Sequence, residues 1–204
     1  MPALYLPVLL MLAALIFRGV AFEFRHKAVR QTTRKFWNGA FFGGSLTAAL
    51  AQGLMLGAFI KGVTVTNNAF SGGAFDWLSP FSILVAISVT TGYVLLGACW
   101  LSLKTEGELY AKARAWTRRL AVFVAMGFFT VSLATLSVGV GVSERWGFSM
   151  REIDLPTLLP LLPLPLLGGL LLFGLWRELW LKPGDRPAKD WRPYLMTAGV
   201  FLTG

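Results

Sequence analysis

The chain has 204 residues, of which 55% are hydrophobic and only 14% are charged. Because an average soluble domain carries about 25% charged residues, this composition excludes an ordinary water-soluble fold. The formal net charge is +9, but a nucleic-acid-binding protein places such an excess on one face of a soluble module or in a docking motif. The sequence contains neither, so we expect no nucleic acid partner and an integral membrane protein.

Five apolar blocks are each long enough to cross a hydrocarbon core about 30 Å thick at about 1.5 Å per helical residue. They are expected at 4–22, 37–60, 80–103, 120–142 and 155–181. A sixth block, 193–204, stops after little more than half of the length needed to span. Since lipid does not tolerate an open backbone end, we expect a truncated helix that continues beyond the sequence. The prediction is one all-α domain over 1–204, a polytopic transmembrane helix bundle with five full spanning helices and a truncated sixth.

Basic residues lie unequally on the two sides of these blocks. The less basic side has only Lys61, Arg145 and Arg151. The other side has the remaining sixteen of the 19 basic residues: Arg18, Arg25, Lys27, Arg30, Arg34, Lys35, Lys104, Lys112, Arg114, Arg118, Arg119, Arg177, Lys182, Arg186, Lys189 and Arg192. Loops rich in Lys and Arg remain in the cytoplasm. The first helix is therefore expected to run inward across a bacterial inner membrane.

Residues able to ligate haem or a metal are scarce. The only histidine, His26, lies in a basic loop, and the single cysteine, Cys99, lies inside an apolar block. Haem iron is usually held by His, Cys or Met at the depth of the macrocycle, and the methionines here stand singly among apolar neighbours. We expect no cofactor or metal on this chain, and we expect Cys99 to pack as a small buried apolar residue.

Charged residues near the ends of the blocks suggest a structural role. Arg18 lies about one turn inside the first block, and two roles for it stay open, snorkelling to the interface or a buried structural partner. Opposite charges at similar depth predict a polar cluster of Arg18, Glu23 and the stretch from Lys104 to Glu108, which includes Glu106. Glu178, near the end of the fifth block, is the one Asp or Glu within a block, so independent catalysis or pumping is not expected.

Small residues recur at helical spacing in the second block. The pairs are Gly39 with Gly43 and Gly53 with Gly57. Such spacing favours close approach of two helices in lipid. Gln52 lies among them and must find a partner at membrane depth, since an unpaired amide there costs several kcal/mol, roughly. We favour helix packing over ligand binding for this group.

Several motifs occur in a fixed order along the first half of the chain. They are ALYLP (3–7), LIFRGVAFEFR (15–25), FGGSLTA (42–48), QG (52–53), LGAFI (56–60), GG (72–73), DWL (76–78), PFS (80–82) and KTEGEL (104–109). In this order they resemble subunit II of the bd-type quinol oxidases, especially the cyanide-insensitive branch. The remainder of the chain resembles that subunit only by hydropathy.

The resemblance implies a function for a complex rather than for this chain alone. Subunit II in that family has nine spanning helices, so the chain would be an internal piece that lacks two helices upstream and the last ones downstream. It would be a non-haem structural subunit paired with a haem-bearing subunit I, which holds the haems and the quinol site. The complex would oxidise quinol and reduce oxygen to water in aerobic respiration.

No proton path is assigned, because the family's intramembrane acidic residues lie in the part upstream. Two other interpretations stay open. One is a helical scaffold of an unrelated assembly. The other is the helical half of a small-solute transporter, which should show inverted repeats and interrupted midplane helices, and only the proline-rich fifth block hints at these. Copurification with a haem-bearing partner distinguishes the interpretations.

Overall fold

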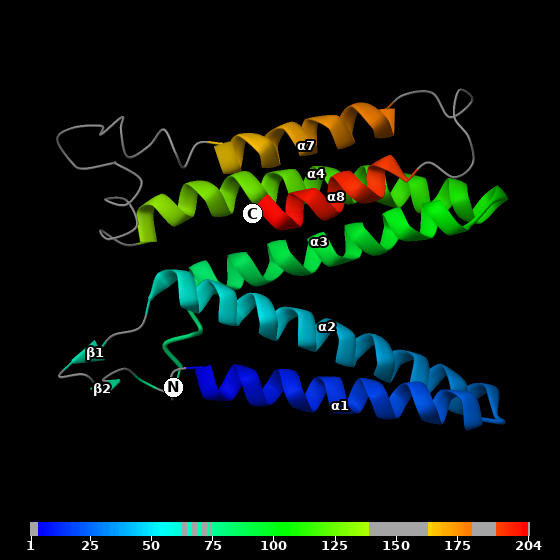
Figure 1. The fold of residues 1–204 in the computed structure, drawn as a ribbon. Helices are drawn as coiled ribbons and strands as arrows, with labels where there is room; N and C mark the ends of the chain where they lie inside the picture. The colour runs from blue at the N-terminus through cyan, green and yellow to red at the C-terminus, as the bar shows by residue number, and fades with distance from the viewer. Residues whose placement is uncertain are drawn as a thin grey trace. The chain divides into compact units, whose positions relative to one another are not determined.

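The computed structural model describes residues 4–62, 65–66, 69–70, 73, 75–138, 163–180 and 191–203. These residues form six helices and one short ribbon (Figure 1). The helices are α1 (Tyr5–Lys27), α2 (Gln31–Lys61), α3 (Pro80–Lys104), α4 (Gly107–Val138), α7 (Pro163–Trp180) and α8 (Arg192–Thr203). In the ribbon, β1 (Val65–Thr66) pairs antiparallel with β2 (Ala69–Phe70). The expected helical architecture is confirmed, with this ribbon as the one addition in the described residues.

Four helices in the described part are long and apolar enough to cross a membrane: α1, α2, α3 and the stretch Gly107–Thr135 of α4. A multi-pass membrane protein is thereby confirmed. The expected fifth block began at 155, and residues 155–162 lie outside the described residues. The described part of that block is α7, with 18 residues, so the count of five full spans is not confirmed.

The helix ends differ from the predicted blocks. α1 continues to Lys27 rather than ending at 22, α2 begins at Gln31 rather than 37, and α4 begins at Gly107 rather than 120. Hydropathy marks the part of a helix that lies in lipid, whereas the helix itself continues through the headgroup layer. Ion pairs one turn apart support these extensions: Lys27 Nζ lies 2.8 Å from Glu23 Oε1, and Lys112 Nζ lies 2.7 Å from Glu108 Oε1.

Tertiary contacts divide the chain into two compact units, Met1–Thr90 and Thr91–Gly204. The first unit holds α1, α2, the ribbon and the first part of α3. The second unit holds the rest of α3 with α4, α7 and α8. The single domain over 1–204 stays a prediction.

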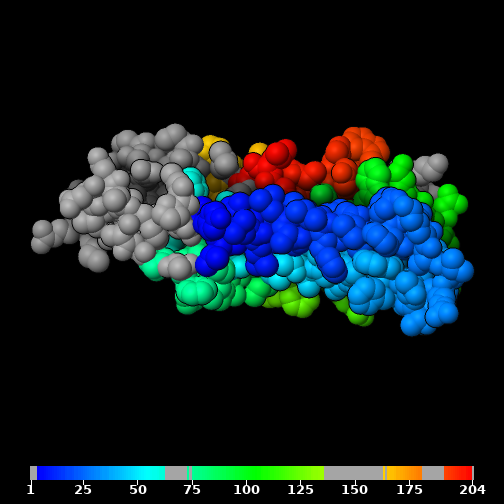
Figure 2. Space-filling view, turned by 90° about the horizontal axis from the view of Figure 1, so that it is seen from below, coloured from blue at the N-terminus to red at the C-terminus, as the bar shows by residue number. Residues whose placement is uncertain are grey.

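In the first unit, α1 and α2 lie side by side and antiparallel (Figure 1). The buried residues of α1 are small and recur every seventh position: Pro7, Ala14 and Ala21. Those of α2 are also small, with Gly44 packed so closely that a Cβ there would lie 3.0 Å from the carbonyl oxygen of Ala14. In lipid the hydrophobic effect does not drive helices together, and close packing through small residues favours their association instead. Figure 2 shows α1 lying open along its length on one face.

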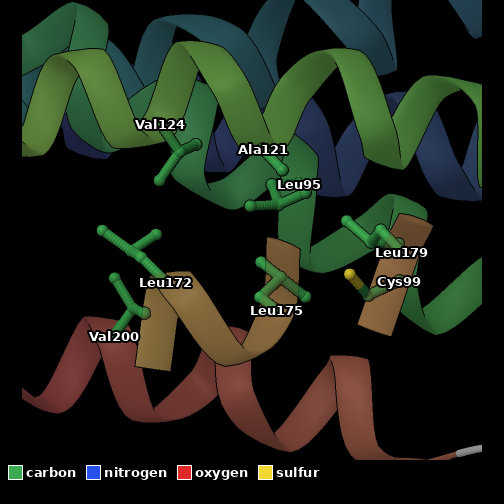
Figure 3. Packing of buried hydrophobic residues seen from close by; sticks show 8 residues of the cluster. All are labelled: Leu95, Cys99, Ala121, Val124, Leu172, Leu175, Leu179 and Val200. Atoms are coloured by element: carbon green, nitrogen blue, oxygen red, sulfur yellow. The ribbon is translucent and has the colours of Figure 1, made fainter. Parts of the chain in front are cut away.

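The second unit has its own apolar core (Figure 3). Four helices contribute to it: Leu95 and Cys99 from α3, Ala121 and Val124 from α4, Leu172, Leu175 and Leu179 from α7, and Val200 from α8. Cys99 is only 1% exposed, so its predicted role as a small buried residue is confirmed.

Candidate functional site

The closest helix contact in the first unit lies where α2 crosses α3. A Cβ added to Gly53 would lie 2.5 Å from the Cα of Ala86, and one added to Gly57 would lie 2.5 Å from the Cα of Ser82. Real Cβ atoms do not approach another backbone so closely, so only glycine fits at either position. The partners Ser82 and Ala86 are themselves small and four residues apart. Two pairs of small residues therefore face each other across this crossing.

The start of α3 fixes the position of this crossing along the helix. The amide of Ser82 donates to the hydroxyl of Ser79 over 3.1 Å, which caps the helix, and the two hydroxyls are 2.9 Å apart. Both serines are buried. Pro80 occupies the first helical position, where a missing N–H is tolerated. Capping therefore places Ser82 directly against Gly57.

The other predicted glycines behave differently. A Cβ at Gly39 or Gly43 would have nothing within 4 Å in the described part of the chain. Gln52, between the two pairs, is exposed on the described surface and makes an interaction with the protein. The small-residue pattern of the second block therefore contains one packed pair and one open pair.

Arg18 and Glu23 lie on α1 in the first unit. The guanidinium carbon of Arg18 lies 5.2 Å from the centre of the Phe41 ring of α2, and the Arg18 side chain is exposed. Glu23 pairs with Lys27 of its own helix. A cation over a ring is worth about 0.5–1 kcal/mol at an exposed site. Arg18 is thus held at the α1–α2 interface by an aromatic contact.

The other members of the predicted polar cluster lie in the second unit. Lys104 Nζ lies 5.1 Å from the centre of the Trp100 ring, Glu108 pairs with Lys112, and Glu106 is exposed between α3 and α4. These contacts stay within α3 and within α4. A cluster that joins them to Arg18 and Glu23 stays a prediction.

Two arginines that the sequence analysis did not single out connect α4 to α7. Arg118 Nε donates to the carbonyl oxygen of Leu179 over 2.7 Å, and Arg114 Nη2 donates to that of Glu178 over 3.4 Å. The last carbonyls of a helix have no partner within the helix, so cations are favoured there. Arg118 also lies 5.6 Å from the Trp180 ring centre. The signal available in the sequence was a pair of arginines one turn apart before an apolar run.

α8 packs closely against the second part of α3. A Cβ at Gly92 would lie 2.6 Å from Phe201 Cζ, and the rings of Tyr93 and Phe201 stack 5.2 Å apart. Deeper in this unit, Cys99 Sγ lies 3.4 Å from Thr197 Oγ1, whose hydroxyl donates to the carbonyl of Pro193 over 2.8 Å. The buried polar atoms of α8 are thus hydrogen-bonded, as lipid requires.

Among the described residues, no three or more His, Cys, Asp or Glu side chains gather as metal ligands would. His26 is exposed at the end of α1, with Nδ1 2.9 Å from the carbonyl oxygen of Phe22. What the described residues build is a set of close helix interfaces and anchored helix ends.

The comparisons with known proteins agree with this architecture. The family profile of cytochrome bd terminal oxidase subunit II matches residues 1–204. A probable cytochrome oxidase subunit 2 of Haemophilus influenzae is 31% identical over 149 residues, which cover 71% of this chain and 38% of the relative. The cytochrome bd-I ubiquinol oxidase subunit 2 of Escherichia coli K12 is 30% identical over 142 residues, 67% of this chain and 37% of the relative. The corresponding Bacillus subtilis protein is 31% identical over 125 residues, 60% of this chain and 37% of the relative.

The aligned part spans less than two fifths of each of these relatives. The profile match extends over every residue of the chain, and the four apolar helices that it covers suit a membrane-embedded subunit. The chain therefore belongs to the cytochrome bd terminal oxidase subunit II family.

Proposed function

We propose that this chain is part of the non-haem structural subunit of a bd-type quinol:oxygen oxidoreductase in a bacterial inner membrane. It supports a haem-bearing subunit I, and the complex oxidises quinol and reduces oxygen in aerobic respiratory electron transport. The observation that carries the proposal is the match of the subunit II profile to residues 1–204. The Escherichia coli relative is named a ubiquinol oxidase subunit 2, which supports quinol as the substrate of the complex and a second subunit as the partner.

The described histidine and cysteine side chains do not lie as haem ligands would. His26 is the only histidine of the chain, and it is exposed beyond the apolar part of α1. Cys99 is enclosed by the core of the second unit and contacts Thr197. An axial ligand must face the macrocycle at its own depth. We therefore assign the haems to the partner and no cofactor to this chain.

The helix interfaces within each unit support the proposed structural role of the subunit. Packing of α2 on α3 through glycine and of α4 on α7 through arginine gives helices with fixed positions in each unit. Such helices present a rigid surface to a partner in lipid, where close packing rather than the hydrophobic effect drives association. In this proposal the fifth block, which contains α7, also spans the membrane, and α8 begins a sixth helix.

The test uses the full-length protein with an affinity tag, as wild type and as His26→Ala. We expect both forms to copurify with a haem-bearing subunit and to give the same reduced-minus-oxidised haem spectrum. Although Nδ1 of His26 is held by Phe22, its Nε2 remains a chemically competent ligand, so the spectrum is decisive. A tagged wild-type protein that purifies without haem would contradict the oxidase assignment and favour the transporter interpretation. Loss of one haem signal from an assembled His26→Ala complex would show that the subunit does hold haem.

A further inference from the structure

The end of the α1–α2 hairpin carries an unusual excess of positive charge. The basic hairpin, as we call it, consists of Arg25, Lys27, Arg30, Arg34 and Lys35. Along the chain, the nearest acidic residues are Glu23 before it and Asp76 after it. Five cations thus fall within eleven positions with one carboxylate beside them.

The protein compensates little of this charge. Lys27 pairs with Glu23, but Arg30, Arg34 and Lys35 are exposed, and the described residues contain no ion pair to any of these three. The cations near the α3–α4 turn are used differently. Lys112 pairs with Glu108, Lys104 lies over Trp100, and the two arginines at 114 and 118 bind carbonyls of α7. Within the described residues, the positive charge of the basic hairpin is therefore left largely uncompensated.

The length of α2 places the basic hairpin at headgroup depth. α2 has 31 residues, or about 46 Å at about 1.5 Å per residue, whereas the hydrocarbon core is about 30 Å thick. Its apolar part begins near Trp37, whose ring stacks on Phe24 at 5.2 Å. Trp is enriched at the boundary between hydrocarbon and headgroups. Arg34 and Lys35 lie within one turn of that boundary, on its polar side.

The beginning of α2 adds to the same positive field. Its N-cap, Arg30, makes no side-chain capping bond, and its first turn has no acidic residue. The positive end of the helix dipole therefore coincides with uncompensated cations. An anion at this position would neutralise both.

We propose that the basic hairpin binds the headgroups of anionic phospholipids in the cytoplasmic leaflet. Guanidinium groups match the geometry of phosphate oxygens, and a polybasic segment next to a spanning helix attracts anionic lipid. A lipid fits better than an acidic protein surface because Arg34 and Lys35 lie within one turn of Trp37, a residue type enriched at headgroup level. The site holds the inner end of the hairpin at a fixed depth. This inference is independent of the oxidase assignment.

The test compares two variants of the full-length protein, each lacking two positive charges on the same predicted side. Arg30→Gln with Lys35→Gln removes charge from the basic hairpin. Lys104→Gln with Lys112→Gln is the matched control, because its lysines already have protein partners. The proteins are placed in phosphatidylcholine bilayers that contain spin-labelled phosphatidylglycerol or spin-labelled phosphatidylcholine. The fraction of motionally restricted label gives the preference for the anionic lipid.

We expect the hairpin variant to lose about five-fold in preference for each charge removed, and the control to change less than about two-fold. Equal losses in both variants would overturn the proposal, because general surface charge would then explain the preference. Unchanged preference, with loss of another protein from the purified complex, would also overturn it and assign the basic hairpin to an acidic protein surface. If the hairpin variant does not fold, the wild type is titrated with salt. A preference for phosphatidylglycerol that persists at about 1 M salt, where the Debye length is about 3 Å, contradicts the proposal.

Discussion

The missing side chain of Gly57 determines how closely α2 can approach α3. With 2.5 Å between its hypothetical Cβ and the Cα of Ser82, there is no space even for a methyl group unless a backbone moves. At Gly43, on the same helix, no described residue lies within 4 Å of the corresponding position. Both glycines fit the same small-residue spacing in the sequence, but of the two only Gly57 is packed closely against a described residue of another helix.

Replacing Gly57 by valine should therefore destabilise the α2–α3 contact, while Gly43→Val should not. The expected loss for Gly57→Val is about 1–3 kcal/mol, the usual effect of forcing methyl groups into a packed interface. Valine has the same helix propensity at both positions, so Gly43→Val controls for backbone effects. The measurement is the free energy of unfolding of the full-length protein in detergent. Equal destabilisation by both substitutions would show that the close contact is not what stabilises this crossing.

The sequence identified these glycines but could not separate them. Gly39, Gly43, Gly53 and Gly57 fit the same spacing rule, and each pair predicts close packing equally well. Which pair packs depends on where Ser82 and Ala86 of the next helix arrive, and this is a tertiary property. The same reason explains Arg114 and Arg118, whose partners are backbone carbonyls of a helix about 60 residues later.

At the scale of elements, the last turn of α7 is linked to the first half of α4. Arg118 supplies a charged donor to the carbonyl of Leu179, one of the last in α7. Hydrogen bonds to charged groups contribute about 1.5–3 kcal/mol. Arg118 should therefore stabilise the last turn of α7 more than any contact within that turn.

Arg118→Gln should loosen the last turn of α7. We expect amide hydrogen exchange over residues 177–180 to accelerate by about ten-fold, which corresponds to about 1.4 kcal/mol, with no change at the start of that helix. Arg119→Gln is the control, since Arg119 is the neighbouring arginine and is exposed. If both variants exchange alike, the bond to Leu179 does not hold this turn.

The sequence predicted which segments form helices, but it did not predict where these helices begin and end. The apolar run from Leu120 indicated a spanning helix correctly, but α4 begins at Gly107. The helical turns from Gly107 to residue 119 contain Glu108, Lys112 and Arg114. Because these residues are charged, hydropathy predicted a loop there. They are helical because Glu108 and Lys112 pair one turn apart and because Arg114 and Arg118 reach α7 from one helical face.

At the scale of the whole molecule, the orientation of the helices in the membrane follows from charge. The inner side is predicted to hold sixteen of the 19 Lys and Arg residues. Lys61 ends α2, on the side predicted to be external, and Lys112 lies in the first turns of α4, on the side predicted to be cytoplasmic. Both side chains are exposed. These two positions therefore report on opposite faces of the membrane.

Lys61→Cys and Lys112→Cys should react differently in intact cells. In a full-length protein without other cysteines, we expect a membrane-impermeant maleimide to label position 61 and not position 112. Both positions should be labelled after permeabilisation, which controls for accessibility. Labelling of 112 alone in intact cells would reverse the orientation and would place the basic hairpin in the outer leaflet.

The anchoring of α7 by α4 has a consequence for biosynthesis. The residues joined by these bonds are 64 and 61 positions apart in the chain. At about 5–20 residues per second, the ribosome needs roughly 3–12 s after completing Arg118 to supply its partner. In the predicted orientation these guanidinium groups lie near the headgroup layer, where lipid phosphates and water can solvate them during this interval. We therefore expect α4 to insert before α7 is synthesised, with Arg114 and Arg118 ready to bind the carbonyls of α7.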